Sequence, residues 1–253
     1  MIQLKNVYKY FQDKKILSGV NLEIETGKIT TIVGRSGCGK SVMLKHIVGL
    51  LKPDEGQVLI QDKDISQMSA SELYQVRKKI GLVFQAGALF DSMSVYENIS
   101  LGLREHSLLS EIEMEKKVSK LLEMIGLPGI EQYRPSELSG GMRKRVSLAR
   151  ALAMDPEYVL YDEPTTGLDP IMSAIIDDMI VRLNEELHIT SIVVTHDMKS
   201  VYKISDRVAM LHYGIVRFNG TTDELKNTAD AVVRQFIEGN VVGPIQPVLK
   251  DGR

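Results

Sequence analysis

The sequence has one cysteine, no tryptophan, no long apolar run and almost balanced charge. The single cysteine, Cys38, excludes an internal disulfide and a cysteine metal cluster, and it favours a reducing compartment. No apolar run reaches the about 18 residues that a membrane span needs, and the first residues are not typical of a signal peptide. With 31 Lys and Arg against 33 Asp and Glu, the net charge of −2 argues against a protein that coats nucleic acid.

The apolar pattern predicts two kinds of sheet. Hydrophobic residues make up 43% of the 253 residues, which is typical of a globular chain with one large or two small domains. Alternating apolar and polar residues over 2–24 predict antiparallel strands. Nearly all-apolar runs at 29–33, 158–161, 191–195 and 207–211 are separated by helical patterns. Such runs are typical of a parallel sheet that helices cover on both faces.

The middle of the chain is predicted to be helical. Ser69, Ser94 and Ser110 are each followed three residues later by glutamate, and this spacing fits a capping box at a helix start. We therefore expect a helical insertion over about 87–154. The last stretch, 240–253, contains two prolines and is predicted to be an appended tail.

A glycine-rich loop between a predicted strand and a predicted helix matches the phosphate-binding pattern G-x-x-x-x-G-K-[ST]. Its residues are Gly34, Arg35, Ser36, Gly37, Cys38, Gly39, Lys40 and Ser41. Glycines let the backbone amides wrap phosphate oxygens, and the following helix adds its dipole. Lys40 is expected to reach the β- and γ-phosphates, and the Ser41 hydroxyl to bind Mg²⁺. We interpret Cys38 as a small buried residue.

Two adjacent acids follow the apolar strand at 158–161. Asp162 is predicted to hold the Mg²⁺ shell, and Glu163 to accept a proton from an attacking water. Seen alone, such a pair is more often a helix cap before a proline, here Pro164. Beside a phosphate-binding loop, the functional interpretation is favoured.

Further motifs follow in a fixed order. These motifs resemble those of ATP-binding cassette (ABC) ATPases. The run 138–145, Leu-Ser-Gly-Gly-Met-Arg-Lys-Arg, resembles the signature sequence, and Gln85, after a strand, resembles the Q-loop glutamine. Gly-Leu-Asp at 167–169 resembles the D-loop, and His196, after another strand, resembles the switch histidine. The resemblance covers about residues 2–239.

This resemblance implies an α/β fold with a P-loop NTPase (RecA-like) parallel-sheet core. It also implies an N-terminal antiparallel β subdomain and an inserted α-helical subdomain at about 87–154. We therefore expect one nucleotide-binding domain over 2–239, followed by the tail 240–253. The implied cofactors are ATP and Mg²⁺, and the implied activity is ATP hydrolysis.

The family's site residues transfer to matching positions. The helix start at Ser139, Gly140 and Gly141 is expected to bind the γ-phosphate held by a second copy, so that two chains enclose two ATP molecules. Asp169 belongs to the same ATP site. The resemblance makes His196 a contact of the γ-phosphate and the attacking water. It makes Gln85 a contact of Mg²⁺ or of that water.

An aromatic ring near the N-terminus is expected to stack on adenine. Phe11 aligns with the family's ring, usually tyrosine, and Tyr10 is the fallback. Otherwise both rings pack in the antiparallel sheet.

Other positions depart from the family or have ordinary interpretations. Met142 stands where the signature commonly has glutamine, and Lys63 where a hairpin often has glycine, so we expect a strained positive φ at Lys63. Arg143, Lys144 and Arg145 are interpreted by default as a solvated basic face, and no nucleic-acid partner is expected.

Within the family, several segments resemble ATPases of the Mla/Mce lipid-transport systems. These segments are 39–45, 85–90, 103–106, 139–145, 232–239 and 243–245. The resemblance implies a homodimeric ATPase that drives the permease of an inner-membrane transporter of phospholipid or related lipid. A Mce-type lipid-binding protein is the expected further partner, and the cytoplasmic face of the inner membrane the expected location. Alternatives are another ABC importer or exporter and a non-transport ABC ATPase.

Two segments are predicted to contact partners. The run 86–93 is apolar for a loop, and one interpretation is a groove for a short helix of the membrane subunit; the other is local core packing. The tail 240–253 is hypothesised to pack against the second copy.

Overall fold

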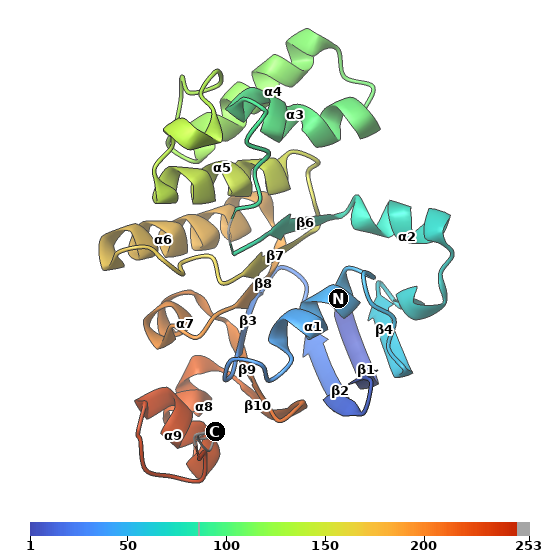
Figure 1. The fold of residues 1–253 in the computed structure, drawn as a ribbon, viewed down its shortest axis with the longest axis vertical. Helices are drawn as coiled ribbons and strands as arrows, with labels where there is room; N and C mark the ends of the chain where they lie inside the picture. Colours follow the sequence, from blue (N-terminus) through green and yellow to red (C-terminus); the bar gives the residue numbers. More distant parts are fainter. Residues whose placement is uncertain (86, 247–253) are drawn as a thin grey trace, which may run out of the picture.

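The N-terminal part forms an antiparallel sheet, as the alternating pattern predicts. The computed structural model describes residues 1–85 and 87–246. Four strands lie in the order β2-β1-β4-β5 (Figure 1). They are β1 (Ile2–Phe11), β2 (Lys14–Ile24), β4 (Glu55–Ile60) and β5 (Lys63–Asp64).

A six-stranded sheet forms the centre of the molecule, in the order β10-β9-β3-β8-β7-β6. Its strands are β3 (Ile29–Val33), β6 (Ile80–Val83), β7 (Tyr158–Asp162), β8 (Thr190–Val194), β9 (Arg207–His212) and β10 (Ile215–Gly220). The strands from β9 to β6 are parallel, and β10 pairs antiparallel with β9. Every residue of β3 and β8 is buried, because helices and the second sheet cover both faces.

The helices divide between the sheet faces and one end of the molecule. They are α1 (Lys40–Ile47), α2 (Ala70–Arg77), α3 (Val95–His106), α4 (Glu111–Met124), α5 (Gly140–Leu152), α6 (Pro170–Leu187), α7 (Met198–Ile204), α8 (Thr222–Lys226) and α9 (Ala231–Glu238), with short 3₁₀ turns at Ile65–Gln67 and Pro135–Glu137. In Figure 1, α3 and α4 lie at the end of the molecule farthest from α8 and α9. Helix α5 lies between the pair α3 and α4 on one side and α6 on the other.

This arrangement confirms the predicted fold class. The capping boxes expected at Ser69, Ser94 and Ser110 all form at the starts of α2, α3 and α4. The helices α3, α4 and α5 lie within the predicted insertion 87–154, although its boundaries, like those of the 2–239 domain, stay predictions. Among the described residues, no helix combines the length and apolar character of a membrane span.

The hairpin between β4 and β5 differs from the expectation. The positive φ angles are at Gln61 (50°) and Asp62 (62°), whereas Lys63 already begins β5. A two-residue turn that matches the twist of its strands needs positive φ at both central residues. The strain predicted for Lys63 was therefore wrong, because the turn lies one position earlier.

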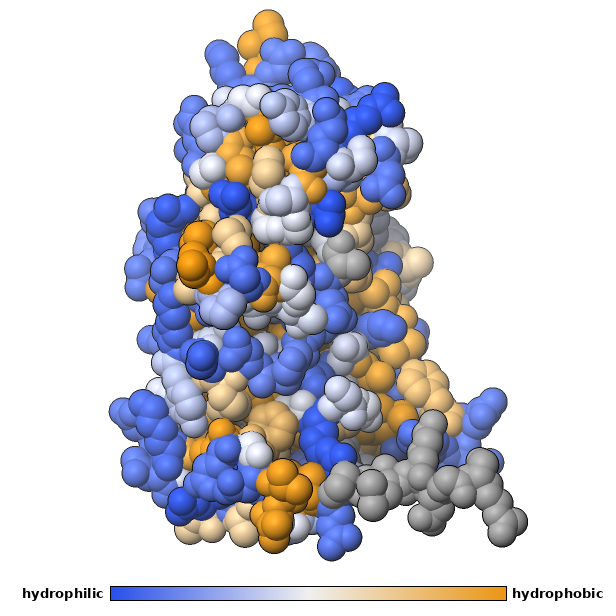
Figure 2. All heavy atoms as spheres, turned by 60° about the vertical axis from the view of Figure 1, so that its left-hand side comes forward, coloured by the Kyte–Doolittle hydropathy of each residue, from blue (hydrophilic) through white to orange (hydrophobic). Residues whose placement is uncertain are grey.

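The start of the tail packs on its own chain. The Gln235 side chain donates to the carbonyls of Asn240 (3.1 Å) and Ile245 (3.0 Å) and accepts from the Ile245 amide. Ile245 is buried. Val241 and Val242 remain exposed, and Figure 2 shows hydrophobic surface at this lower end of the molecule. Residues 247–253 lie outside the described part, so the contact of the tail with a second copy stays a prediction.

Asn98 orders the loop that leads into α3. Its fully buried side chain accepts from the Phe90 amide (2.8 Å) and donates to the carbonyls of Phe90, Met93 and Ser94. We predict that Asn98→Ala lowers the free energy of unfolding by about 2–3 kcal/mol, because buried polar groups lose their partners. Urea denaturation measures this loss. Ser110→Ala, which removes an exposed cap, should cost only about 1 kcal/mol. Equal losses in the two variants would contradict the role given to Asn98.

Candidate functional site

The predicted site residues come together because β3, β6, β7 and β8 run parallel. The carboxyl ends of parallel strands share one edge of a sheet, and ligands of open α/β folds bind there. The phosphate-binding loop follows β3, Gln85 follows β6, Asp162 ends β7 with Glu163 next, and His196 follows β8.

The phosphate-binding loop closes around Lys40. Its ammonium donates to the carbonyls of Gly34 (2.6 Å) and Arg35 (3.2 Å), and Lys40 is buried. Gly34 has a φ of 148°, and a Cβ there would lie 2.3 Å from the Leu211 carbonyl oxygen. Gly39 has a φ of 110° at the start of α1. The loop conformation therefore requires glycine at both positions.

Ser41 and Asp162 form a pair of hard oxygen ligands. The Ser41 hydroxyl lies 3.4 Å from Asp162 Oδ1. Burial raises the pKa of Asp162, because desolvation disfavours its charged form. Mg²⁺ uses one or two protein oxygens together with substrate phosphates, so this pair fits such an ion. The described residues contain no separate group of three or more His, Cys, Asp or Glu that could hold a metal.

Glu163 occupies a strained backbone position. Its φ is 52°, in the left-handed region, which costs a non-glycine residue about 1–2 kcal/mol. The Glu163 amide donates to the Val194 carbonyl (2.8 Å). Its carboxylate Oε2 accepts from the Thr166 hydroxyl (3.0 Å) and lies 2.8 Å from His196 Nδ1. The Glu163 side chain is 13% exposed and that of His196 is 63% exposed, so the pair opens to solvent through the histidine.

Lys144 does not belong to a solvated basic face. The residue is only 8% exposed, and its ammonium donates to the backbone carbonyls of Gln85 and Glu163. Burial lowers its pKa, and the carboxylates of Glu163 and Asp162 oppose this shift. Arg145 likewise donates to the carbonyls that end α4. The default interpretation was wrong for Lys144 and Arg145, because both side chains lie between packed elements, whereas Arg143 is exposed as that interpretation predicts.

The signature residues lie at the start of α5, where the first two of the Ser-Gly-Gly positions are accessible. Ser139 caps the helix by accepting from the Met142 amide (3.2 Å), and both Ser139 and Gly140 are exposed. A Cβ on Gly141 would lie 2.4 Å from Met172 Cε, the end of a flexible side chain of α6, so this side chain would have to shift to admit a larger residue. Asp169 caps α6 through the amides of residues 171 and 172. The hydrogen bonds of the Ser139 and Asp169 side chains are made to the first turns of their own helices, and none of these bonds reaches the phosphate-binding loop.

A cavity of about 540 Å³ lies beside the phosphate-binding loop. Its lining residues are Lys14, Lys15, Ile16, Ser18, Arg35, Ser36, Gly37, Cys38, His212, Tyr213 and Gly214. Three cations and no acid line it, which suits a polyphosphate. The β9–β10 turn at 212–214 was not predicted from the sequence, because only Gly214 of its two positive-φ residues, Tyr213 and Gly214, is a residue that such turns favour.

Neither candidate adenine-stacking ring lines this cavity. Phe11 is 44% exposed and Tyr10 36% exposed, at the end of β1. Lys9 Nζ lies 5.8 Å from the Phe11 ring centre, and Lys15 Nζ lies 5.8 Å from that of Tyr10. Stacking by Phe11, with Tyr10 as the fallback, therefore stays a prediction.

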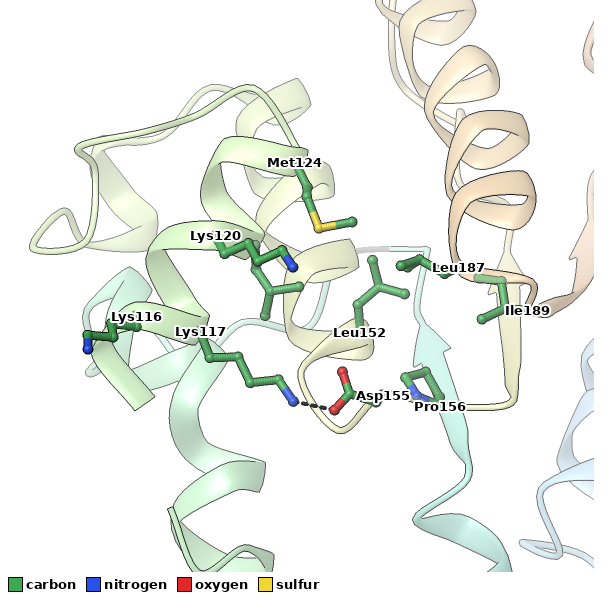
Figure 3. A pocket seen from close by; sticks show the side chains of 10 residues that line it. Lys116, Lys117, Lys120, Met124, Leu152, Asp155, Pro156, Leu187 and Ile189 are labelled. Atoms are coloured by element: carbon green, nitrogen blue, oxygen red, sulfur yellow. Dashed lines mark hydrogen bonds and ion pairs between the residues drawn. The ribbon is translucent and has the colours of Figure 1, made fainter. Parts of the chain in front are cut away.

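A second cavity, of about 450 Å³, lies away from these motifs (Figure 3). Lys116, Lys117 and Lys120 of α4 lie on one side, and apolar residues such as Leu152 and Ile189 on the other. Lys117 forms an ion pair with Asp155. Because the cavity includes residues just before β7 and β8, it lies at the amino ends of these strands, opposite the phosphate-binding edge.

The fold and the gathered motifs define a P-loop nucleotide-binding protein. A sequence model of the ABC transporter family matches residues 17–166. The chain therefore belongs to the ABC transporter family and is an ATP-binding, ATP-hydrolysing cassette.

Named relatives cover nearly the whole chain. "Intermembrane phospholipid transport system ATP-binding protein MlaF" of Haemophilus influenzae is 43% identical, over 97% of this chain and 93% of that protein. "Probable ribonucleotide transport ATP-binding protein mkl" of Mycobacterium leprae is 41% identical, over 96% of this chain and 70% of that protein. The dimeric structure of MJ0796, a bacterial ABC transporter cassette, is 37% identical with a TM-score of 0.81, over 87% of this chain and 98% of that chain.

Cys38 offers a chemical test of the loop. Burial raises the pKa of its thiol, and the charge of Lys40 opposes this only in part. Because the thiolate is the reactive form, we predict that iodoacetamide labels the folded chain about tenfold more slowly than free cysteine at neutral pH. The rate should increase as the pH rises, and it should approach that of free cysteine in denaturant. Mass spectrometry measures it. Cys38 is only partly buried, and not fully buried as the sequence predicts. Equal rates for folded and denatured protein would contradict even this partial burial.

Proposed function

We propose that the chain hydrolyses ATP with Glu163 as the base for the attacking water. The 2.8 Å contact between Glu163 and His196 carries this proposal, because it brings the base and the switch histidine to the edge that holds Lys40. Lys40 and the loop amides bind the β- and γ-phosphates. Glu163 accepts the proton from water, and His196 orients that water and contacts the γ-phosphate.

Mg²⁺ fits beside these residues, held by Ser41 and by Asp162, with Gln85 joining from the loop after β6. When bound, the ion neutralises phosphate charge. The chain's own contribution is to place the hydroxyl and the carboxylate and to bring the Gln85 loop to the same edge of the sheet.

Two copies of the chain complete the ATP site. Ser139, Gly140 and Gly141 lie at the start of α5, where Ser139 and Gly140 are exposed. The amides of this helix start and the positive end of its dipole suit the γ-phosphate held by a partner. Asp169 positions the neighbouring start of α6. The dimeric cassette MJ0796, with its similar fold, supports this arrangement.

A membrane permease docks through the surface near Gln85. A cleft of about 440 Å³ lies between α2, β6, α3 and α5, with Tyr74, Phe84 and His106 among its lining residues. Phe84 and Phe90 are both exposed. Such an apolar cleft suits a short amphipathic helix, the partner predicted for the loop 86–93, of which residue 86 lies outside the described part.

Phospholipid or related lipid is the proposed cargo, moved between membranes at the expense of ATP. The names of the MlaF proteins of Haemophilus influenzae and Escherichia coli support it, at 43% and 38% identity. The assembly then contains the permease and a Mce-type lipid-binding protein, with this chain peripheral on the cytoplasmic face of the inner membrane. Transport of another substrate is the alternative, because the 41% identical relative from Mycobacterium leprae carries a ribonucleotide-transport name.

Glu163→Gln tests the catalytic assignment. We predict that the variant still binds ATP but loses about 100-fold or more in turnover, because the amide cannot accept the proton. Phosphate release and filter binding of labelled ATP measure the two properties. Lys40→Ala is the matched variant, and it should instead lose ATP affinity. Turnover near that of the unmodified chain in Glu163→Gln would contradict the assignment.

Copurification tests the cargo. We predict that an affinity-tagged chain, solubilised from membranes in mild detergent, brings a permease and a lipid-binding protein with it, together with phospholipid. Mass spectrometry identifies proteins and lipids in the same sample. A permease accompanied by a soluble substrate-binding protein and no enriched lipid would contradict lipid transport and favour the alternative.

A further inference from the structure

Lys144 connects three parts of the proposed site. It lies on α5, four residues after Gly140, and its side chain points inward from the helix that carries the signature motif. Its ammonium reaches two backbone carbonyls that are far apart in sequence, that of Gln85 after β6 and that of Glu163 after β7. One side chain thus joins the helical segment to two loops at the phosphate-binding edge.

Packing alone does not explain a lysine here. Residue 144 is 8% exposed, and burying an ammonium costs free energy unless strong partners compensate. A methionine would fill similar space without that cost. The compensation comes from the two carbonyl oxygens and from the nearby carboxylates of Glu163 and Asp162.

The hydrogen bond from Lys144 to the Glu163 carbonyl acts on a residue with an unfavourable backbone conformation. Glu163 has a φ of 52°, and a non-glycine residue keeps this conformation only when its surroundings enforce it. Its amide donates to the Val194 carbonyl, and its own carbonyl accepts from the Thr166 amide (3.3 Å) and from the Lys144 ammonium (3.3 Å). Of these three bonds, only that of Lys144 comes from α5, so this bond links the Glu163 backbone to the signature helix.

The Gln85 loop is held to the same helix by a second cation. Arg150, on the following turns of α5, donates to the carbonyls of Gly87 (3.1 Å) and Ala88 (2.7 Å). Arg150 therefore links α5 only to the loop, whereas Lys144 also reaches Glu163.

We propose that Lys144 is a positioning residue for ATP hydrolysis: it holds Glu163 in its left-handed conformation and links that conformation to the signature helix and to the Gln85 loop. A displacement of α5 then acts directly on the backbone of Glu163. The inference rests on the proposed catalytic role of Glu163, and it assigns Lys144 no contact with ATP.

Steady-state kinetics of the full chain, in the complex that copurifies from membranes, test this role. In Lys144→Met we expect kcat to fall about tenfold, with the KM for ATP and the ATP affinity within about twofold, because the phosphate-binding loop is untouched. Lys144→Arg should recover most of the loss, since its guanidinium also donates to carbonyls. Lys120→Met, on the exposed side of α4, is the matched control and should behave like the unmodified chain.

Several results would overturn the inference. The inference is wrong if the kcat of Lys144→Met lies within about twofold of that of the unmodified chain. It is also wrong if Lys120→Met loses as much kcat as Lys144→Met. Failure of Lys144→Arg to recover activity while it folds normally would also overturn it. If Lys144→Met does not fold, Lys144→Gln, which keeps one hydrogen-bond donor, takes its place with the same expected split between kcat and KM.

Glu163→Gln, measured alongside, separates the two proposals. Full activity in Glu163→Gln overturns the catalytic role of Glu163, and the Lys144 inference with it. An inactive Glu163→Gln together with a fully active Lys144→Met overturns the Lys144 inference alone.

Discussion

The parallel pairing of β3, β8, β7 and β6 is the constraint on which the rest of the structure depends. Each of these strands is followed or ended by a candidate site residue at its carboxyl end, and parallel pairing brings the four ends to one edge of the sheet. Burial on both faces holds the register, because a slip would move the apolar side chains of the strands out of their packing. The position of Glu163 relative to Lys40 therefore follows from the central sheet.

Strain at Glu163 is the second determinant of the site. A glutamate with positive φ persists here because contacts from β8, α5 and the switch histidine all bear on it. The same contacts come from elements that the proposed mechanism requires to move or to bind ATP. The contacts that hold the strained backbone of Glu163 are thus the same contacts that bring the candidate site residues together.

The sequence predicts most of the architecture and the identity of the site motifs. The loop from Gly34 to Ser41 follows from local spacing, and the capping boxes at Ser69, Ser94 and Ser110 follow from a three-residue pattern whose physics is local. The apolar strands follow from their length and composition. Each of these patterns depends on residues that are close in sequence, so it can be recognised without knowledge of the tertiary structure.

What the sequence does not predict depends on contacts between distant residues. A lysine flanked by two arginines has the pattern of a solvated face, and only the packing of α5 against two loops buries Lys144. The turn at 212–214 lies beside the phosphate-binding loop because β9 neighbours β3, which no local pattern reveals. The position of the strained turn next to Lys63 depends on strand register in the same way.

We propose that two copies enclose ATP between the phosphate-binding loop of one and the start of α5 of the other. An experimental structure of the Glu163→Gln chain with MgATP tests it most directly. We expect two ATP molecules per dimer, each with its γ-phosphate between Lys40 of one copy and Ser139 and Gly140 of its partner. ATP bound at the phosphate-binding loop with the partner's α5 far from its γ-phosphate would contradict the proposed dimer.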